Sequence, residues 1–303
     1  MEAEGAIRGL IGKVGDLDMK KTLLSLAAAA GIGLASAPAS AVVVAGIDFG
    51  ALGLGNVHLE TMTLAEQFIN PTTTAPGTGT GMGYGYITTI NGGANYCVAG
   101  GGCGLFYTVN FGGGTFTSAT QIEFTTTDVN IYYLNGPLIN LLSQDSPTNL
   151  ALIQAGTLYA TFNGHGNLGG GLGAGVVGVA SGNLTGSTLG LSGRGLLDVD
   201  IADGLGNASF EQFLDGSGVP DAAGGFADVE YNESANNFVL NSHDISGGFA
   251  TGCSTGAAAS GAWCWQGTLN TRGVANVPEP GSIALLGIAL LGAAGLSRRK
   301  SKA

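Results

Sequence analysis

The sequence predicts an all-β fold, an antiparallel β-sandwich or jelly-roll-like domain flanked by an N-terminal signal helix and a C-terminal hydrophobic helix. Two observations predict the β domain. Glycine makes up 56 of the 303 residues and Thr, Asn and Ser fill much of the rest, whereas the good helix formers Glu and Lys are scarce. Short β-branched and aromatic runs also recur between Gly and Asn turns, a spacing typical of sandwiches.

Eight of these runs are expected to be strands: Tyr84 to Ile90, Leu105 to Phe111, Gln121 to Phe124, Val129 to Leu134, Leu158 to Phe162, Phe226 to Tyr231, Phe238 to Leu240 and Ala262 to Leu269. Two segments are expected to be short helices: Leu59 to Phe68 and Leu138 to Leu142. The Thr/Gly/Pro-rich stretch from Pro71 to Gly83 predicts a loop. The glycine-rich stretch from Gly164 to Gly195 is punctuated by Val and Leu, which is compatible with edge strands.

The first 41 residues contain an export signal. From Met19 the chain reads MKKTLLSLAAAAGIGLASAPASA, with two lysines, an apolar segment and the small residues Ala39, Ser40 and Ala41. This order predicts a secretory signal peptide cleaved after Ala41. Residues 1 to 18 contain four acidic residues, which does not suit a positively charged leader, so we expect translation to start at Met19. A genuinely extended leader is the alternative.

Residues 277 to 303 form a tripartite tail. The motif Pro278, Glu279, Pro280 is followed by an apolar run from Ile283 to Leu296, and then by a basic cluster of Arg298, Arg299 and Lys300. A helix over this run would rise about 1.5 Å per residue and fall short of the roughly 30 Å hydrocarbon core, so it spans only with its flanks. The basic cluster marks the cytoplasmic side and leaves the preceding domain outside.

This tail resembles the PEP-CTERM sorting signal of bacterial exported proteins, with the letters Pro278, Glu279 and Pro280 intact. The resemblance implies recognition and processing by the membrane enzyme exosortase. It also implies transit through the inner membrane to the cell surface or the exopolysaccharide matrix. Residues 104 to 134, GLFYTVNFGGGTFTSATQIEFTTTDVNIYYL, are similar to the middle region of the flocculation-associated PEP-CTERM subset. An ordinary tail anchor is the alternative interpretation.

The domain between these signals, residues 42 to 276, is strongly acidic. It contains sixteen Asp and Glu against two arginines, Arg194 and Arg272, and no lysine, which gives a net charge of −14. Nucleic-acid binding is excluded as a function, because affinity for phosphates is built from Lys and Arg. Ten of the acids lie between Asp198 and Asp244. Such a surface keeps an exported protein soluble, and weak Ca²⁺ binding is the alternative. We expect no cofactor.

Four cysteines fit the oxidising exported compartment. Cys97 and Cys103 bracket one short loop, and Cys253 and Cys264 bracket another, so two local disulfides are expected. Four cysteines allow three connectivities, and a metal site is a competing interpretation that lacks the usual paired spacing. Loops this short would be pinned by their disulfides, without the fold depending on them.

Three motif matches are interpreted as coincidences of a glycine-rich chain. The G-x-S-x-G match at residues 252–256 lacks the strand and helix that a hydrolase nucleophile needs. The G-x-G-x-x-G match at residues 173–178 lacks a βαβ unit. The acids Asp198, Asp200 and Asp203 resemble part of a Ca²⁺ loop, but the ligand positions are incomplete.

The remaining polar residues select no catalytic site. His58, His165 and His243 are dispersed, and nothing in the sequence singles out a carboxylate pair for glycoside hydrolysis. Trp263 and Trp265 share one face of a strand, where core packing is the commoner use and sugar stacking the alternative. With no catalytic site selected, the resemblance to PEP-CTERM proteins implies a non-enzymatic matrix, biofilm or flocculation protein. A secreted glycan hydrolase and a carbohydrate- or Ca²⁺-binding module are the alternatives.

Overall fold

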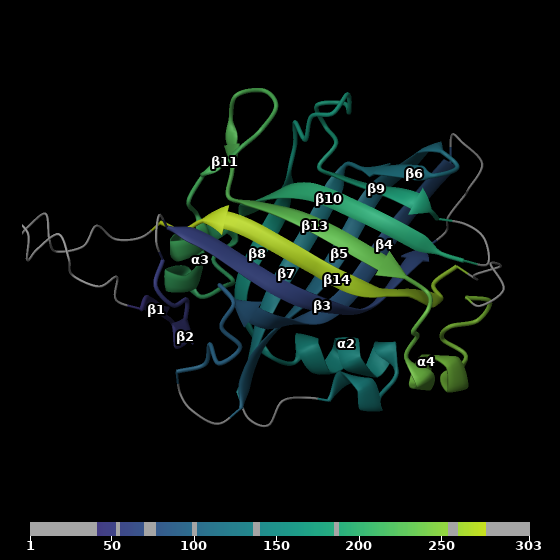
Figure 1. The fold of residues 1–303 in the computed structure, drawn as a ribbon, viewed down its shortest axis with the longest axis horizontal. Helices are drawn as coiled ribbons and strands as arrows, with labels where there is room; N and C mark the ends of the chain where they lie inside the picture. The colour runs from purple at the N-terminus through teal and green to yellow at the C-terminus, as the bar shows by residue number, and fades with distance from the viewer. Residues whose placement is uncertain are drawn as a thin grey trace, which may run out of the picture. The chain divides into compact units, whose positions relative to one another are not determined.

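The computed structural model describes residues 41–52, 55–69, 77–98, 102–135, 140–184, 188–253 and 260–276. Its main feature is one ten-stranded sheet in which every pairing is antiparallel, so the predicted all-β, antiparallel class is confirmed (Figure 1). The strands are β3 (Asn56–Ile69), β4 (Gly77–Ile90), β5 (Cys103–Ser118), β6 (Gln121–Phe124), β7 (Thr126–Asn135), β8 (Thr157–His165), β9 (Gly178–Asn183), β10 (Gly190–Val199), β13 (Val229–Asn236) and β14 (Trp263–Val274).

The sheet closes on itself. Its order is β13-β14-β3-β4-β5-β6-β9-β10-β8-β7, and two further pairings, β10 with β13 and β5 with β7, join the ring. The long strand β5 pairs with β7 along one part and with β6 along the rest, while β10 is shared among β8, β9 and β13. The two halves of the sheet therefore face each other across a common core, as the layers of a sandwich do.

Short elements complete the described part of the fold. Two small ribbons pair β1 (Val43–Val44) with β2 (Ile47–Asp48) and β11 (Val219–Pro220) with β12 (Phe226–Ala227). The helices are η1 (Leu141–Ser143), α2 (Ser146–Gln154), η2 (Ile201–Asp203), α3 (Ala208–Leu214) and α4 (Ser242–Gly247). Each α-helix begins at an Asp or Asn whose side chain accepts a backbone N–H of the first turn, which satisfies a donor that the helix leaves free.

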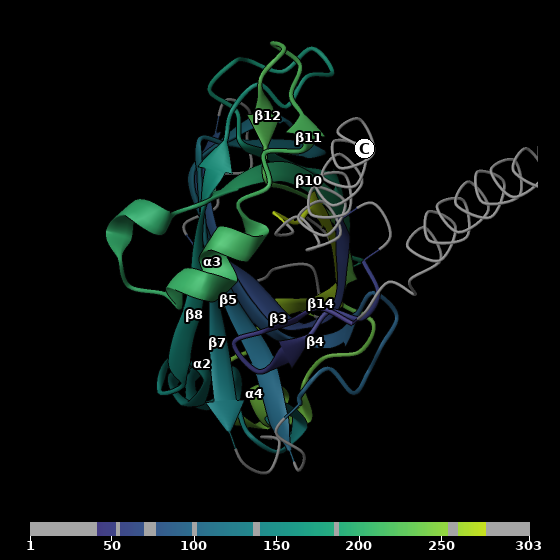
Figure 2. The ribbon, with the colours of Figure 1, turned by 90° about the vertical axis from the view of Figure 1, so that its left-hand side faces the viewer.

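Helix α3 lies across one end of the closed sheet, as Figure 2 shows from that end. Its residues Phe210, Phe213 and Leu214 are buried in the main core. The ring of Phe49 packs against both phenylalanines, with centroid distances of 5.7 Å to Phe210 and 4.5 Å to Phe213. Tilted aromatic contacts of this kind stabilise beyond the area they bury. This end of the interior is therefore filled by side chains.

A second core lies on the outer face of the sheet beneath α2. It joins Phe106 of β5 and Trp263 of β14 to Leu141 and Ile153 of the helical segment. This cover explains why residues 103–109 of β5 are buried on both faces and read as a continuous apolar run, where an exposed strand would alternate.

Several expectations about single elements are wrong. The expected helix from Leu59 to Phe68 lies within β3, because pairing with β4 and β14 overrides its helix-forming residues. Residues 77–83 of the expected loop begin β4, and residues 71–76 lie outside the described part. The expected strand from Phe238 to Leu240 is a bend leading to α4, in which Phe238 and Val239 are exposed and Leu240 is half-buried. The glycine-rich stretch from Gly164 to Gly195 does contain strands, yet β10 is a three-partner strand and not an edge.

The remaining predicted strands lie near strands of the structure, but most of them are shorter than those strands. Six of the eight expected runs overlap β4, β5, β6, β7, β8 and β14, most of which extend beyond the predicted ends. The expected run from Phe226 to Tyr231 is divided between β12 and β13. Of the expected helix from Leu138 to Leu142, residues 140–142 are described, and Leu141 starts the 3₁₀-helix η1.

Candidate functional site

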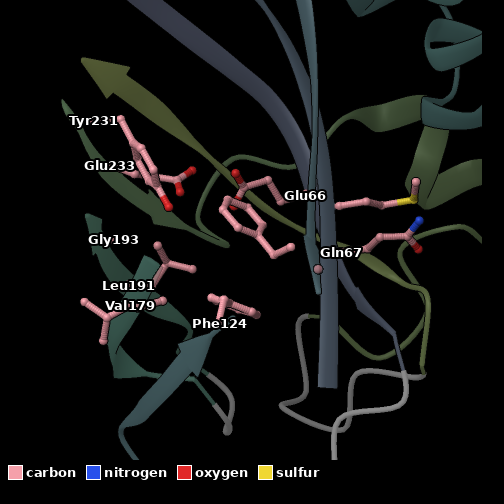
Figure 3. Close-up of a pocket in the computed structure, with 12 residues that line it drawn as sticks. Glu66, Gln67, Phe124, Val179, Leu191, Gly193, Tyr231 and Glu233 are labelled. Atoms are coloured by element: carbon pink, nitrogen blue, oxygen red, sulfur yellow. The ribbon is translucent and has the colours of Figure 1, made fainter. Parts of the chain in front are cut away.

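Two carboxyl groups meet inside the closed sheet. Glu66 of β3 and Glu233 of β13 approach from strands on either side of β14, and each side chain is only 6% exposed. Figure 3 shows both carboxyl groups pointing into the same space, beside the ring of Tyr231. The end of β14 beyond Val274 hydrogen-bonds to Phe213 of α3, whereas its start pairs with the part of β3 that carries Glu66. The pair thus lies away from the end that α3 covers.

Glycines on the neighbouring strands make room for these side chains. Glu66 is paired with Gly83 of β4, where a Cβ atom would lie 2.6 Å from Cγ of Glu66. Tyr231 is paired with Gly195 of β10, where a Cβ atom would lie 2.4 Å from the phenol ring. Glu233 is paired with Gly193 of the same strand. These polar side chains therefore fit inside the sheet because the paired residues are glycines, which have no side chain to block their close approach.

Burial dominates the electrostatics of this pair. Burial raises the pKa of Glu66 well above its usual value, and the charge and hydrogen bond of Glu233 raise it further. Burial also raises the pKa of Glu233, and the hydrogen bond from Glu66 opposes that rise. Both directions are those of two carboxyl groups that share a proton. The pKa of Tyr231 is raised by burial and by both carboxylates, so its phenol stays neutral.

The pair opens into a small cavity of about 20 Å³. Besides the two glutamates and Tyr231, its walls are mostly apolar and include Phe111, Phe124, Val179 and Leu191. By the same measure a water molecule needs about 10–15 Å³, so the cavity holds one or two groups of that size. The cavity is too small for a sugar ring, since pockets that bind small molecules usually measure about 300–1,000 Å³.

A second polar cluster surrounds His165 at the end of β8. Its Nδ1 lies 2.7 Å from Oδ2 of Asp198, and its Nε2 lies 3.1 Å from Oδ2 of Asp221. Partial burial opposes the charged imidazole, but hydrogen bonds and charges from the two carboxylates outweigh it and raise the pKa of His165. The hydrogen bond from His165 in turn lowers the pKa of Asp221. The cluster joins β8 and β10 to the β11–β12 ribbon.

The three acids that resemble a Ca²⁺ loop face different donors. Asp198 contacts His165, Asp200 accepts the backbone N–H groups at the start of η2, and Asp203 accepts the hydroxyl of Thr161 at 2.7 Å. Their carboxylates do not converge on one point. Across the described ranges, no group of three or more His, Cys, Asp or Glu side chains is placed to hold a metal ion.

Neither the tryptophan pair nor the two glycine-rich motif matches forms a site within the residues that the structure describes. Trp263 and Trp265 are 4% and 2% exposed, so neither offers a face to a sugar. The expectation that they share one face is wrong: a register shift separates them, and Trp263 packs in the core beneath α2 whereas Trp265 packs in the main core. The match to G-x-G-x-x-G lies in the segment leading into β9, between antiparallel strands. In the G-x-S-x-G match, Cys253 is tied up in a disulfide, and residues 254–256 lie outside the described part.

Both local disulfides are present: Cys97 is bonded to Cys103, and Cys253 to Cys264. Of the predicted cleavage site, Ala41 is exposed and Ala39 lies outside the described residues. The sorting motif Pro278, Glu279 and Pro280 and the basic cluster Arg298, Arg299 and Lys300 also lie outside them.

Sequence reasoning did not select the pair of Glu66 and Glu233. One signal existed on each strand: Tyr231 and Glu233 alternate with polar residues, and Gly193 and Gly195 alternate in the same way. Residues two apart on a strand share a face, so each pattern marks a possible match of large with small side chains. Only the pairing of β13 with β10 shows that the two patterns meet.

Comparison with protein families found a match to the PEP-CTERM protein-sorting motif over residues 276–300. Comparison with curated proteins found no match. None of the helices in the described ranges has both the length and the apolar character needed to cross a bilayer. The matched residues contain the Pro-Glu-Pro letters, the apolar run and the arginines on which the resemblance rested. The motif implies export to the cell surface and processing by exosortase, a membrane enzyme. The chain thus carries at residues 276–300 a PEP-CTERM protein-sorting motif, which supports an exported protein that exosortase processes.

Proposed function

We propose that the domain of residues 42–276 is a non-enzymatic protein of the extracellular matrix that promotes cell aggregation, as in a biofilm or floc. The observation that carries this proposal is the sorting motif at residues 276–300, which addresses an acidic, disulfide-containing domain to the cell surface. A matrix polysaccharide is the proposed partner.

A cluster of exposed apolar side chains supports a role in association. Phe238 and Val239 are 74% and 69% exposed in the bend before α4, and Ile245 and Phe249 are exposed in and just after that helix. Large apolar side chains gathered on one part of a surface commonly mark a place of contact with other molecules. The acidic remainder of the surface keeps the unbound protein soluble.

The described polar clusters also favour binding over catalysis. The carboxyl pair lies in a cavity of about 20 Å³, which leaves no room for a glycosidic bond between the two acids. Both ring nitrogens of His165 are occupied by carboxylates, so this histidine is not free to activate a nucleophile.

The test is complementation of a deletion strain of the native host. The full chain should restore floc or biofilm formation, whereas a chain lacking residues 277–303 should be exported and fail to restore it. The double substitution Phe238→Ser with Val239→Ser should weaken aggregation while leaving surface display unchanged. The proposal fails if the deletion strain aggregates normally. Release of reducing ends when the purified protein is incubated with the host's exopolysaccharide would instead show a hydrolase.

A further inference from the structure

The interior carboxyl pair has acceptors without donors. Oε1 of Glu66 and Oε1 of Glu233 are fully buried and make no hydrogen bond. Buried polar atoms in proteins are satisfied in the great majority of cases, so two such atoms facing one cavity call for a donor that the chain does not supply. The mature domain has no lysine, and the side chains of Arg194 and Arg272 are exposed on the outside of the sheet.

The cavity presents three oxygen atoms to an occupant of limited size. Two of them are the unpaired carboxyl oxygens, and the third is the phenol oxygen of Tyr231, whose ring lies beside the carboxyl groups in Figure 3. The volume of about 20 Å³ admits a group as small as a water molecule or an ammonium head. The aromatic rings of Phe111 and Phe124 line the same space.

An apolar cavity adjoins this site. It has a volume of about 40 Å³, and both cavities are lined by Phe111 and Tyr231. Its other walls include Val109, Leu197 and Leu269. Thr61, Tyr107 and Thr271 also line it, but most of its walls are apolar, so a short hydrocarbon stem could lie there beside the carboxyl pair.

We propose that Glu66, Glu233 and Tyr231 form a binding site for the ammonium head of a small primary alkylamine. Three N–H donors match three oxygen acceptors, and the charge of the head compensates the carboxylate that the interior otherwise leaves unpaired. The rings of Phe111 and Phe124 suit an organic cation, which aromatic faces attract. The alkyl stem occupies the adjoining apolar cavity.

The site is less suited to a metal ion. Ca²⁺ takes six to eight oxygen ligands, whereas the two carboxyl groups and the phenol offer five. The surrounding walls are apolar and supply no further oxygen-bearing side chain, apart from Gln67 at the margin of the cavity. In Figure 3 Gln67 lies on the other side of the β3 ribbon from the pair.

Calorimetric titration of the full chain in mild detergent tests the proposal, with n-propylamine as the probe at neutral pH. We expect saturable binding, accompanied by proton release that shows as a dependence of the heat on the buffer. Glu66→Gln and Glu233→Gln should each weaken binding by about tenfold or more, since each removes a charge-assisted hydrogen bond. Glu230→Gln is the matched control, because Glu230 lies on the same strand and faces outward.

Four results would overturn the proposal. The first is no saturable binding of n-propylamine, and the second is binding that is unchanged in both glutamine variants. The third is equal binding of 1-propanol, which has the same stem without the charge and would show an apolar cavity alone. CaCl₂ is titrated in parallel, and Ca²⁺ that excludes n-propylamine through Glu66 and Glu233 would identify a metal site in place of an amine site.

Discussion

At the scale of single residues, Gly83 controls whether Glu66 fits into the interior. A Cβ atom at Gly83 would lie 2.6 Å from Cγ of Glu66 and 3.3 Å from the backbone oxygen of Ala65. We expect Gly83→Ala to lower the free energy of unfolding by about 1–3 kcal/mol, the usual cost of overpacking a core. Gly190→Ala is the control, because a Cβ atom there meets nothing within 4 Å, and it should change stability by no more than about 0.5 kcal/mol. Urea unfolding measures both, and equal midpoints would contradict the predicted clash.

The carboxyl pair also gives the protein a pH dependence of stability. Because burial raises the pKa of Glu66 and Glu233, the folded protein keeps a proton at pH values where the unfolded chain has lost it. Stability from this pair therefore falls as pH rises above the usual value of 4.5 and levels off above the folded values. The titratable side chain facing the pair, Tyr231, has its own pKa raised and stays neutral over this range.

Glu66→Gln tests this dependence, since an amide resembles the protonated acid and cannot ionise. The variant should unfold at higher urea concentration than the natural protein at pH 8 and at about the same concentration at pH 4. Glu230→Gln, on the outer face of the same sheet, should leave the difference between the two pH values unchanged. A Glu66→Gln variant that keeps the full pH dependence would show that another group carries it.

At the scale of elements, a buried hydrogen-bond chain fastens α2 and α4 to the sheet. Asp244 of α4 is 1% exposed and accepts both the backbone N–H of Ser146 at 2.7 Å and its hydroxyl at 2.5 Å. The Ser146 hydroxyl lies 2.9 Å from the hydroxyl of Tyr84 on β4, which in turn accepts the Asn149 amide. Burial raises the pKa of Asp244, and the hydrogen bonds from Ser146 oppose that rise.

Ser146→Ala should therefore destabilise the protein by about 1–3 kcal/mol, since it leaves a buried carboxylate oxygen without a donor. Ser246→Ala removes a hydroxyl from α4 that is exposed and donates to the nearby His243 carbonyl, so its cost should stay within about 0.5 kcal/mol. Thermal and urea unfolding compare the two variants. If both lose the same amount, the chain between the helices and β4 contributes no more than a surface contact.

Each disulfide closes a short loop, so we expect it to stabilise that loop and not the sheet as a whole. Their sequence separations are 6 and 11 residues, and chain-entropy estimates for such loops are about 2–3 kcal/mol each. A Cys253→Ala with Cys264→Ala variant should lose about that amount and keep its β-sheet circular dichroism. The Cys97→Ala with Cys103→Ala variant should lose somewhat less, because its loop is shorter. Loss of the folded spectrum in either variant would show that the fold depends on the bridge.

At the scale of the whole molecule, the sorting motif decides where the domain ends up. The matched motif implies processing by exosortase and contains the Pro-Glu-Pro letters, so we expect replacement of Pro278, Glu279 and Pro280 by alanine to leave the chain at full length in the inner-membrane fraction. The unmodified protein should lose its basic end and leave that fraction. Intact mass and fractionation measure both. Recovery of an unmodified chain still ending at Ala303 would contradict processing.

The sequence predicted features that depend on local signals better than features that depend on contacts between distant residues. Strand positions and the two cysteine pairs were predictable, because alternation and short spacing are local signals. The segment from Leu59 to Phe68 was mispredicted because Leu, Glu, Met and Ala favour a helix locally, whereas two neighbouring strands decide its conformation. Glu66 and Glu233 were invisible as a pair because 167 positions separate them along the chain.

The sequence by itself determined the class and the charge of this protein, and it carries the sorting motif: a glycine-rich, acidic, all-β chain with a PEP-CTERM motif at residues 276–300. The tertiary structure alone decided that the sheet closes through β10 with β13 and β5 with β7, and that closure brings two carboxyl groups together over glycines. The reason is physical. Composition and spacing act between near neighbours in the chain, whereas register between distant strands is fixed only when the whole sheet forms.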